Sequence, residues 1–207
     1  MTIFYDDEFV EIDLLLRRGG HINRSDMALY DYMCKHMPEL KEFYARYGCS
    51  LYQHPDGFFY AAIKGGKLQT RLLPKSCVHL GMFIALKARD PEITRSSGRI
   101  SINQLLLDIE TSIPRDILQQ VYAPKRREAV VDECINDELK KALRVLAELS
   151  FIELTDLSIR PLEAISRFAE LARSNNDPSD ENRLNLIVTR GVVFGEGDDE
   201  SKGDSDE

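Results

Sequence analysis

The spacing of apolar residues predicts three helices and one short strand before Gly48. Each helix has an apolar stripe at i, i+3 and i+4 spacing, and the segment "HIN" between the first two helices fits an edge strand. Asp26 is placed to cap the second helix, Pro38 tolerates the first turn of the third, and glycines follow the first and third stripes. The stripes are Phe9, Ile12 and Leu16; Met27, Tyr30, Met33, Cys34 and Met37; and Leu40, Phe43, Tyr44 and Tyr47.

A strand-like alternation replaces the helical spacing between Leu51 and Ile63. The two apolar runs are separated by Pro55-Asp56-Gly57, a turn in which proline presets φ and glycine tolerates a positive φ. We therefore predict a β-hairpin after the third helix. Three helices followed by a hairpin is the element order of a winged-helix domain, a variant of the helix-turn-helix, and we assign the first such domain to residues 1–66.

The same order of elements recurs in the second half of the chain without a visible sequence repeat. A helix is predicted around Val78–Leu86, a strand-like pair and a short helix follow from Ile100, and "FIELTDLSIRP" predicts a short hairpin. Residues 110–128 are interrupted by two prolines and receive no element. A long helix precedes the hairpin, and its apolar face is Ile135, Leu139, Ala142, Leu143, Leu146 and Leu149.

These elements predict a mainly helical α+β fold with tandem winged-helix domains, an extra C-terminal helix and a disordered acidic tail. The second winged-helix domain covers residues 67–161, and a helical extension at 162–194 begins with an amphipathic helix over Leu162–Arg173. Within the extension, "RLNLIVTRGVVF" is apolar enough to dock. Residues 195–207 are too polar to bury themselves.

The net charge of −8 lies mostly in that tail. Residues 195–207 hold seven acids and one lysine, so they contribute −6 and the remaining chain carries −2. By contrast, the segment from Gly57 to Arg89 has no acid and several basic residues. The chain therefore combines a separable acidic tail with a basic segment inside its body.

Composition predicts a cytoplasmic protein without a membrane anchor. No run approaches the roughly 18 apolar residues of a membrane span, and the acidic start lacks the basic region of a signal peptide. The cysteines are scattered without a CxxC pair, so we expect free buried thiols rather than a zinc site. They are Cys34, Cys49, Cys77 and Cys134.

No motif for catalysis is present in the sequence. There is no phosphate-binding glycine loop and no GxSxG, and the four histidines have no metal-site spacing. A lone histidine is more often a surface or core residue than a ligand. We therefore predict no enzymatic activity, no metal and no cofactor. The histidines are His21, His36, His54 and His79.

Basic residues outside the expected recognition helices are the candidates for DNA contact. In the third helix Glu42 and Arg46 are i, i+4 partners, and in the long helix Asp137 with Lys141 and Arg144 with Glu148 have the same spacing. Such pairing leaves little free charge for reading a groove, because phosphate neutralisation supplies most of the affinity. The candidates for sequence-independent backbone contact are Lys64, Lys67, Arg71, Lys75, Lys125, Arg126 and Arg127; the alternative is ordinary solvated charge.

The aromatic residues of the first domain also have two interpretations. Their periodicity fits a hydrophobic core, whereas exposed aromatic residues anchor partner interfaces. The residues are Phe43, Tyr44, Tyr47, Phe58, Phe59 and Tyr60.

The stretch "EFYARYGCSLYQHPDGFFYA" resembles the helix–hairpin segment of the MukE family, the accessory subunits of MukBEF-type bacterial condensins, which have relatives in MksBEF and Jet systems. "LRRGGHI" upstream and "RLLPKSCVHLGMFIAL" downstream fit the same register, as does the acidic C-terminus. The resemblance is strongest over residues 14–86 and weaker to about 173. The family's long helix is more basic near its C-terminal end, where this chain has Ala147 and Glu148, and its N-terminal extension is longer.

The resemblance implies a non-enzymatic homodimer bound to a MukF-like kleisin and, through it, to a MukB-like SMC ATPase. It implies a nucleoid-associated role in chromosome condensation and segregation, with double-stranded DNA held without sequence specificity. On the long helix it leaves Lys140, Lys141 and Arg144 as DNA-contact candidates. The residues themselves leave two alternatives open: a free-standing winged-helix transcription regulator, and an adaptor that contacts only proteins.

Overall fold

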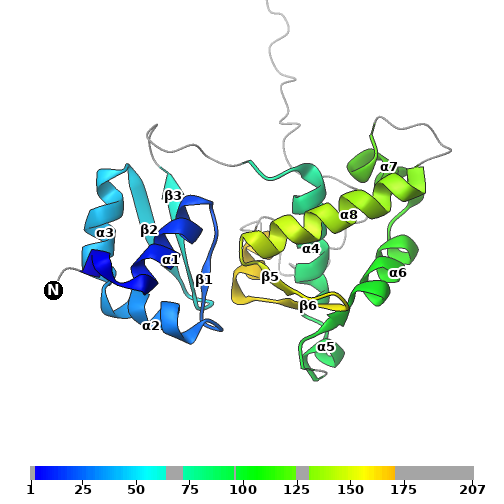
Figure 1. The fold of residues 1–207 in the computed structure, drawn as a ribbon. Helices are drawn as coiled ribbons and strands as arrows, with labels where there is room; N and C mark the ends of the chain where they lie inside the picture. The colour runs from blue at the N-terminus through cyan, green and yellow to red at the C-terminus, as the bar shows by residue number, and fades with distance from the viewer. Residues whose placement is uncertain (1–2, 64–71, 96, 125–130, 171–207) are drawn as a thin grey trace, which may run out of the picture.

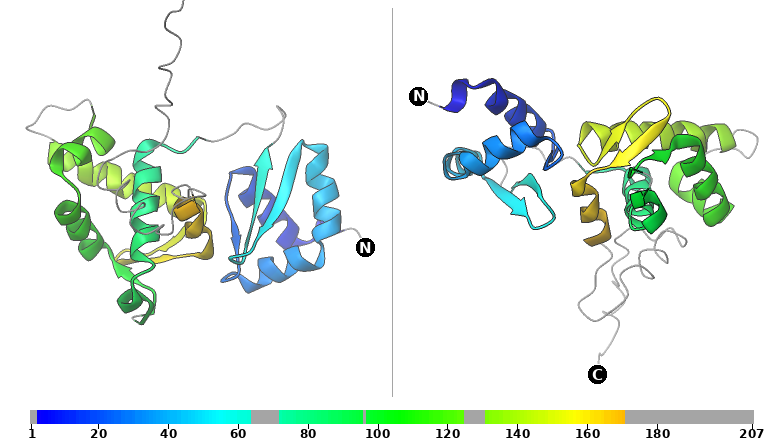
Figure 2. Two further views of the ribbon diagram at one scale, coloured as in Figure 1. Left: turned by 180° about the vertical axis from the view of Figure 1, so that it is seen from behind. Right: turned by 90° about the horizontal axis from the view of Figure 1, so that it is seen from below.

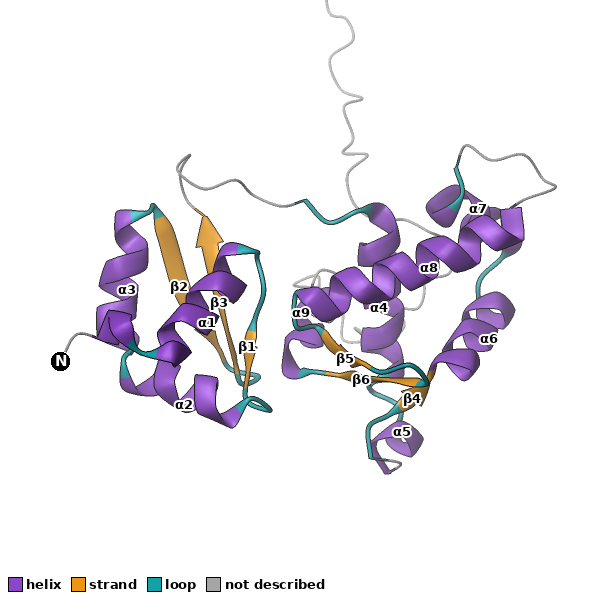
Figure 3. Ribbon diagram, in the orientation of Figure 1, coloured by secondary structure: helices purple, strands orange, loops and turns teal. Residues whose placement is uncertain are grey.

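A computed structural model of the chain describes residues 3–63, 72–95, 97–124 and 131–170 (Figure 1, Figure 3). Its first part packs helices against a three-stranded antiparallel sheet with the order β1-β3-β2, in which Ile22 faces Phe59 and Tyr52 faces Tyr60. The predicted helices, edge strand and hairpin are confirmed. The elements are η1 (Ile3–Tyr5), α1 (Asp7–Arg17), β1 (Ile22–Asn23), α2 (Met27–Lys35), α3 (Met37–Arg46), β2 (Cys49–His54) and β3 (Phe58–Ile63).

The helix ends in this part follow local signals in the sequence. The Asp26 carboxylate accepts a hydrogen bond from the Leu29 amide at 3.3 Å, which confirms the predicted N-cap of α2. At the end of α1, the Gly20 amide donates to the Leu15 carbonyl at 2.9 Å, and the intervening Gly19 has φ +85°. This is a Schellman ending, and glycine is favoured there because a side chain is strained at positive φ.

The second part surrounds one central helix with the long helix α8, several shorter helices and a second antiparallel sheet, β4-β6-β5. In both sheets the third strand lies between the first and the second. The central helix is α4, whose Leu80, Met82 and Ile84 are all inaccessible to solvent (Figure 2). The elements are α4 (Lys75–Lys87), α5 (Pro91–Arg95), β4 (Ile100–Ser101), α6 (Ile102–Ser112), α7 (Arg115–Tyr122), α8 (Val131–Glu148), β5 (Ile152–Leu154), β6 (Ser158–Pro161), η3 (Glu163–Ile165) and α9 (Ser166–Glu170).

Three features in this part differ from the sequence prediction. Helix α7 lies within residues 110–128, where no element was predicted, because Pro114 precedes the first turn and begins a helix instead of breaking one. Helix α5 was also missed, and it too begins at a proline. The last predicted helix starts with the 3₁₀ turn η3, because Leu162 has an extended backbone. The end of that helix, the apolar segment after it and the acidic tail lie outside the described residues.

Two hydrophobic clusters meet at β3. Phe59 belongs to the first cluster and its neighbour Phe58 to the second, because successive side chains of a strand point to opposite faces. Both are completely buried. The hairpin of the first part therefore contributes to the core of the second part.

The cysteines confirm only part of the expected burial. All four are free thiols. Cys49 and Cys77 are buried, but Cys34 on α2 is exposed and Cys134 is intermediate. Cys34 is exposed because it follows Met33, whose side chain occupies the core-facing position of that turn.

Candidate nucleic-acid and partner interfaces

The long helix α8 carries an exposed basic ridge on the side opposite its core face. Lys140, Lys141 and Arg144 are exposed, whereas Leu139, Ala142 and Leu143 between them are buried. This follows from the 3.6-residue period of the helix, which separates the apolar stripe from the charged one. The ridge is continuous, since residues 140, 141 and 144 are neighbours on a helix surface.

The ion pairs on this ridge differ from those predicted. Lys141 Nζ lies 3.9 Å from a Glu138 carboxylate oxygen instead of pairing with Asp137, because i, i+3 partners are also neighbours on a helix. Arg144 forms no ion pair within the described residues, so the predicted pair with Glu148 is not made. The exposed charge of α8 is therefore less neutralised than its sequence suggested.

The start of α4 comes close to this ridge. The Ser76 hydroxyl donates to the Glu138 carboxylate at 2.8 Å, which brings the adjacent, exposed Lys75 towards α8. Because Lys141 also lies beside Glu138, the tertiary structure brings Lys75 near Lys141. The other candidates lie outside the described residues; they are Lys64, Lys67, Arg71, Lys125, Arg126 and Arg127.

Helix α3 behaves as predicted. Arg46 Nη2 lies 2.7 Å from the Glu42 carboxylate, and both side chains are largely exposed. The predicted i, i+4 pair is therefore confirmed, and it reduces the free positive charge on this helix.

The aromatic candidates separate into core and surface residues. Tyr44, Phe58 and Phe59 are at most 1% exposed, so their assignment to a partner surface is wrong and the core interpretation is correct. They are buried because they point inward from α3 and from both faces of β3. Phe43, Tyr47 and Tyr60 are only partly buried and stay candidates for partner contact.

A second apolar surface was missed in the sequence. Val10 and Leu14 lie one turn apart on α1 and are 50% and 51% exposed, and Tyr5 in η1 is 87% exposed. Phe4 in η1 is also exposed, and its ring centroid lies 5.1 Å from that of Phe43. We call Phe4, Tyr5, Val10, Leu14 and Phe43 the α1 face. The signal was present, because Val10 and Leu14 form an i, i+4 pair beside the core stripe.

The two parts of the molecule are joined by buried polar side chains from β1. His21 Nδ1 donates to the Leu149 carbonyl at 2.8 Å, and Asn23 Nδ2 donates to the Ser150 carbonyl at 2.7 Å. The Asn23 side-chain oxygen accepts from the Ala164 amide at 2.9 Å. These carbonyls stand at the C-terminal end of α8, where helical partners are missing. We call this contact the junction.

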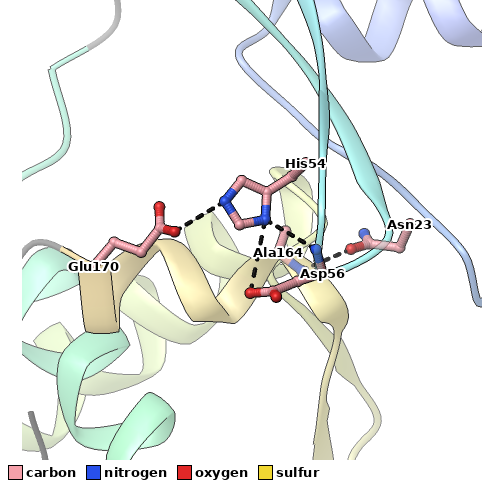
Figure 4. A network of polar contacts seen from close by, with 5 residues as sticks. All are labelled: Asn23, His54, Asp56, Ala164 and Glu170. Atoms are coloured by element: carbon pink, nitrogen blue, oxygen red, sulfur yellow. Dashed lines mark hydrogen bonds and ion pairs between the residues drawn. The ribbon is translucent and has the colours of Figure 1, made fainter.

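The C-terminal helix completes the junction. Arg167 Nη1 donates to His21 Nε2 at 2.7 Å, and its guanidinium lies 4.3 Å from the Tyr60 ring centroid. Nearby, His54 Nε2 donates to the Glu170 carboxylate at 2.9 Å while its Nδ1 accepts from the Asp56 amide (Figure 4). Two of the lone histidines, His21 and His54, therefore connect segments more than one hundred residues apart.

The environment of His21 determines its protonation state. Nδ1 carries the hydrogen because a carbonyl can only accept, and Nε2 is unprotonated because a guanidinium can only donate. The pKa of His21 is lowered to about 3, mainly by burial; the Leu149 hydrogen bond opposes this shift and the nearby positive charge of Arg167 adds to it. His21 is therefore neutral at physiological pH.

The described ranges offer neither a membrane-spanning helix nor a metal-binding cluster. No helix there combines the length and apolar character needed to cross a membrane. Likewise, those ranges contain no group of three or more histidine, cysteine, aspartate or glutamate side chains arranged to hold a metal ion.

Comparison with known proteins identifies relatives over most of the chain. A family model described as condensin complex protein MksE matches residues 7–173. The chain is 26% identical over 188 residues to chromosome partition protein MukE of Photorhabdus laumondii, covering 86% of this chain and 79% of the relative. It is 29% identical over 183 residues to MukE of Aliivibrio salmonicida, covering 86% and 76%. The match to MukE of Escherichia coli is 24% over 184 residues, covering 84% and 80%.

These matches define the class of the protein as a condensin complex protein. Within that class, the chain belongs to the MksE family, because the family model covers far more than half of its residues. The resemblance to MukE that the sequence suggested is confirmed by the relatives.

Proposed function

We propose that this protein is a non-enzymatic accessory subunit of a MukBEF- or MksBEF-type condensin that binds a kleisin and helps to hold DNA during chromosome condensation and segregation. The observation that carries the proposal is the family match over residues 7–173. The kleisin connects the subunit to an SMC ATPase. The protein acts in the cytoplasm, at the nucleoid.

The proposed architecture is a pair of winged-helix domains, at residues 1–66 and 67–161, followed by the extension at 162–194 and the tail at 195–207. It is supported by the shared strand order of the two sheets and by the helix–strand–helix–helix–hairpin order of the first. We place the homodimer contact on the α1 face, because exposed apolar side chains that gather on one surface mark protein interfaces.

DNA is held by its phosphates, without reading of bases. The basic ridge of α8 supports this proposal, because Lys140 and Arg144 form no ion pair within the described residues and Lys75 lies nearby. In α3 the Glu42–Arg46 pair leaves less free charge for a major-groove reader. Lys64, Lys67, Arg71, Lys125, Arg126 and Arg127 extend the proposed contact surface.

Co-purification with a MukF-like kleisin from the same organism tests the assembly. We expect a stable complex on size exclusion, with no ATPase activity in this subunit alone. The double variant Val10→Asp, Leu14→Asp should yield a monomer in analytical ultracentrifugation, whereas Leu157→Asp, at an 80% exposed position in the second hairpin, should not. Failure to bind the kleisin would contradict the proposal.

Salt-dependent DNA binding tests the ridge. In an electrophoretic mobility shift series, Lys140→Glu combined with Arg144→Glu should weaken binding to all duplex sequences. Each lost phosphate contact should lower the slope of log affinity against log salt by about 0.9. Lys35→Glu combined with Lys41→Glu is the matched control, since both side chains are exposed in the first part. Equal losses in the two pairs would refute a ridge-specific contact.

A further inference from the structure

A small cavity at the junction has an apolar floor and a cationic rim. Its volume is about 210 Å³. Leu149, Phe151 and Phe168 supply the floor, and Arg18 and Arg167 supply the positive charge. The two arginines come from opposite parts of the molecule, α9 and the end of α1. We call this space the arginine cavity.

Arg167 lacks a carboxylate partner among the described residues. One of its five N–H groups donates to His21, and the guanidinium stacks over Tyr60, but neither neighbour supplies a full negative charge. Glu170, the acid nearest to it along α9, is held by His54 at 2.9 Å. Burial lowers the pKa of Arg167, and the nearby Tyr60 and Glu170 oppose this shift without cancelling it.

Arg18 adds a second cation without a carboxylate partner among the described residues. It is exposed, and it forms no ion pair with any carboxylate that the structure describes. Two unpaired guanidiniums beside an apolar floor fit a ligand that carries a hydrophobic side chain next to carboxylates. A free inorganic anion would leave the floor uncovered, and a purely apolar ligand would leave the arginines without a partner.

One segment of this chain has that composition. Residues 192–199 read "VVFGEGDD", so Phe194 is followed within five residues by the acids Glu196, Asp198 and Asp199. The other apolar run, "RLNLIVTR", is bounded by arginines, and the last residues of the tail have acids without apolar side chains. The described part of the chain ends at Glu170, two residues after Phe168 of the cavity floor, and the residues up to Phe194 can span up to roughly 80 Å when extended.

We propose that Phe194 occupies the arginine cavity and that the carboxylates of Glu196 and Asp198 pair with Arg167 and Arg18. The C-terminal segment then bridges α1 and α9 and neutralises the two cations at the junction. This inference does not depend on the proposed function, because it concerns a contact within one chain.

The absence of tryptophan from the sequence allows a direct test in the full chain. In the variant Phe194→Trp, the introduced indole should show blue-shifted emission and a Stern–Volmer constant for acrylamide several-fold below that of the control Ser205→Trp. Adding Arg167→Gln, or the triple change Glu196→Gln, Asp198→Asn, Asp199→Asn, should shift the emission to that of the control. The tail variant leaves every described residue intact, so the test survives if Arg167→Gln perturbs folding.

The outcomes separate the proposal from its alternatives. Emission from Phe194→Trp that matches the control, or that ignores the loss of the tail carboxylates, would overturn it. Protection that increases with protein concentration would assign the cavity to the tail of a second copy, which would also overturn docking within one chain. Concentration-independent protection that weakens with added salt is the expected result.

Discussion

Lowering the pH from 8 to 5 is expected to destabilise this protein through His21. In the unfolded chain a histidine has an ordinary pKa of 6.5, whereas burial at the junction lowers the pKa of His21 to about 3. At pH values between these two pKa values, His21 is protonated in the unfolded chain but not in the folded chain. The stabilising contribution is therefore complete above pH 6.5 and is lost as the pH falls towards 3.

The magnitude follows from the two pKa values. At pH 5 the pH is about 1.5 units below the pKa of the unfolded histidine, so that histidine is protonated while the folded one is still neutral. This difference lowers the free energy of unfolding by about 2 kcal/mol. His21 is 1% exposed, so solvent screening reduces this free-energy difference only slightly. The same linkage favours separation of the two parts as the pH falls, because opening the junction also exposes His21 to protonation.

Urea denaturation followed by circular dichroism measures this loss. The comparison is between the natural chain and His21→Asn at both pH values, since the amide keeps a donor for the Leu149 carbonyl but does not titrate. We expect the variant to be less stable at pH 8 and its free energy of unfolding to fall about 2 kcal/mol less on going to pH 5. A fall that is equal in the two proteins would refute the assignment of a neutral histidine to the junction.

Three further perturbations test the packing. Asn23→Ala removes the hydrogen bonds that link β1 to Ser150 and Ala164, so buried polar groups lose their partners. Urea denaturation should show a loss of about 2–3 kcal/mol in the free energy of unfolding. The control Asn103→Ala, at an exposed position, should lose less than about 0.5 kcal/mol. Gly81→Ala places a Cβ 2.6 Å from the Phe168 ring and should lower stability by about 1–3 kcal/mol; an unchanged melting temperature would show that α9 is not seated on α4. In the folded protein, the exposed Cys34 should react first with a thiol reagent. Cys49 should react only on unfolding, because it is buried and burial raises its pKa. Mass spectrometry that finds Cys49 labelled first would contradict the fold.

The local structure was largely predictable because its signals are local. The stripe of α1, the Asp26 cap and the Pro55-Asp56-Gly57 turn each act within a few residues, and the structure confirms all of them. The pairing of Glu42 with Arg46 was predicted for the same reason. Helix α7 shows the limit of such signals, since Pro114 can break a helix or begin one, and only packing decides which.

The candidate surfaces were less predictable because exposure depends on distant parts of the chain. Phe58 and Phe43 are both aromatic residues of the first part, yet Phe58 is buried in the core of the second and Phe43 is partly exposed. Lys75 and Lys141 are far apart in the sequence, and only the Ser76–Glu138 contact brings them together. Neither fact has a signature in residue spacing.

The sequence by itself determined most of the helices, the hairpins and the family, because periodicity, caps and turn residues act over short range and because family motifs are local strings. The tertiary structure alone decided the junction. His21, Asn23 and Arg167 carry no motif, and their roles arise because the end of α8 presents unpaired carbonyls beside β1. Burial then makes a neutral histidine and an incompletely compensated arginine, two electrostatic states that depend on what surrounds each side chain in space and not on its neighbours along the chain.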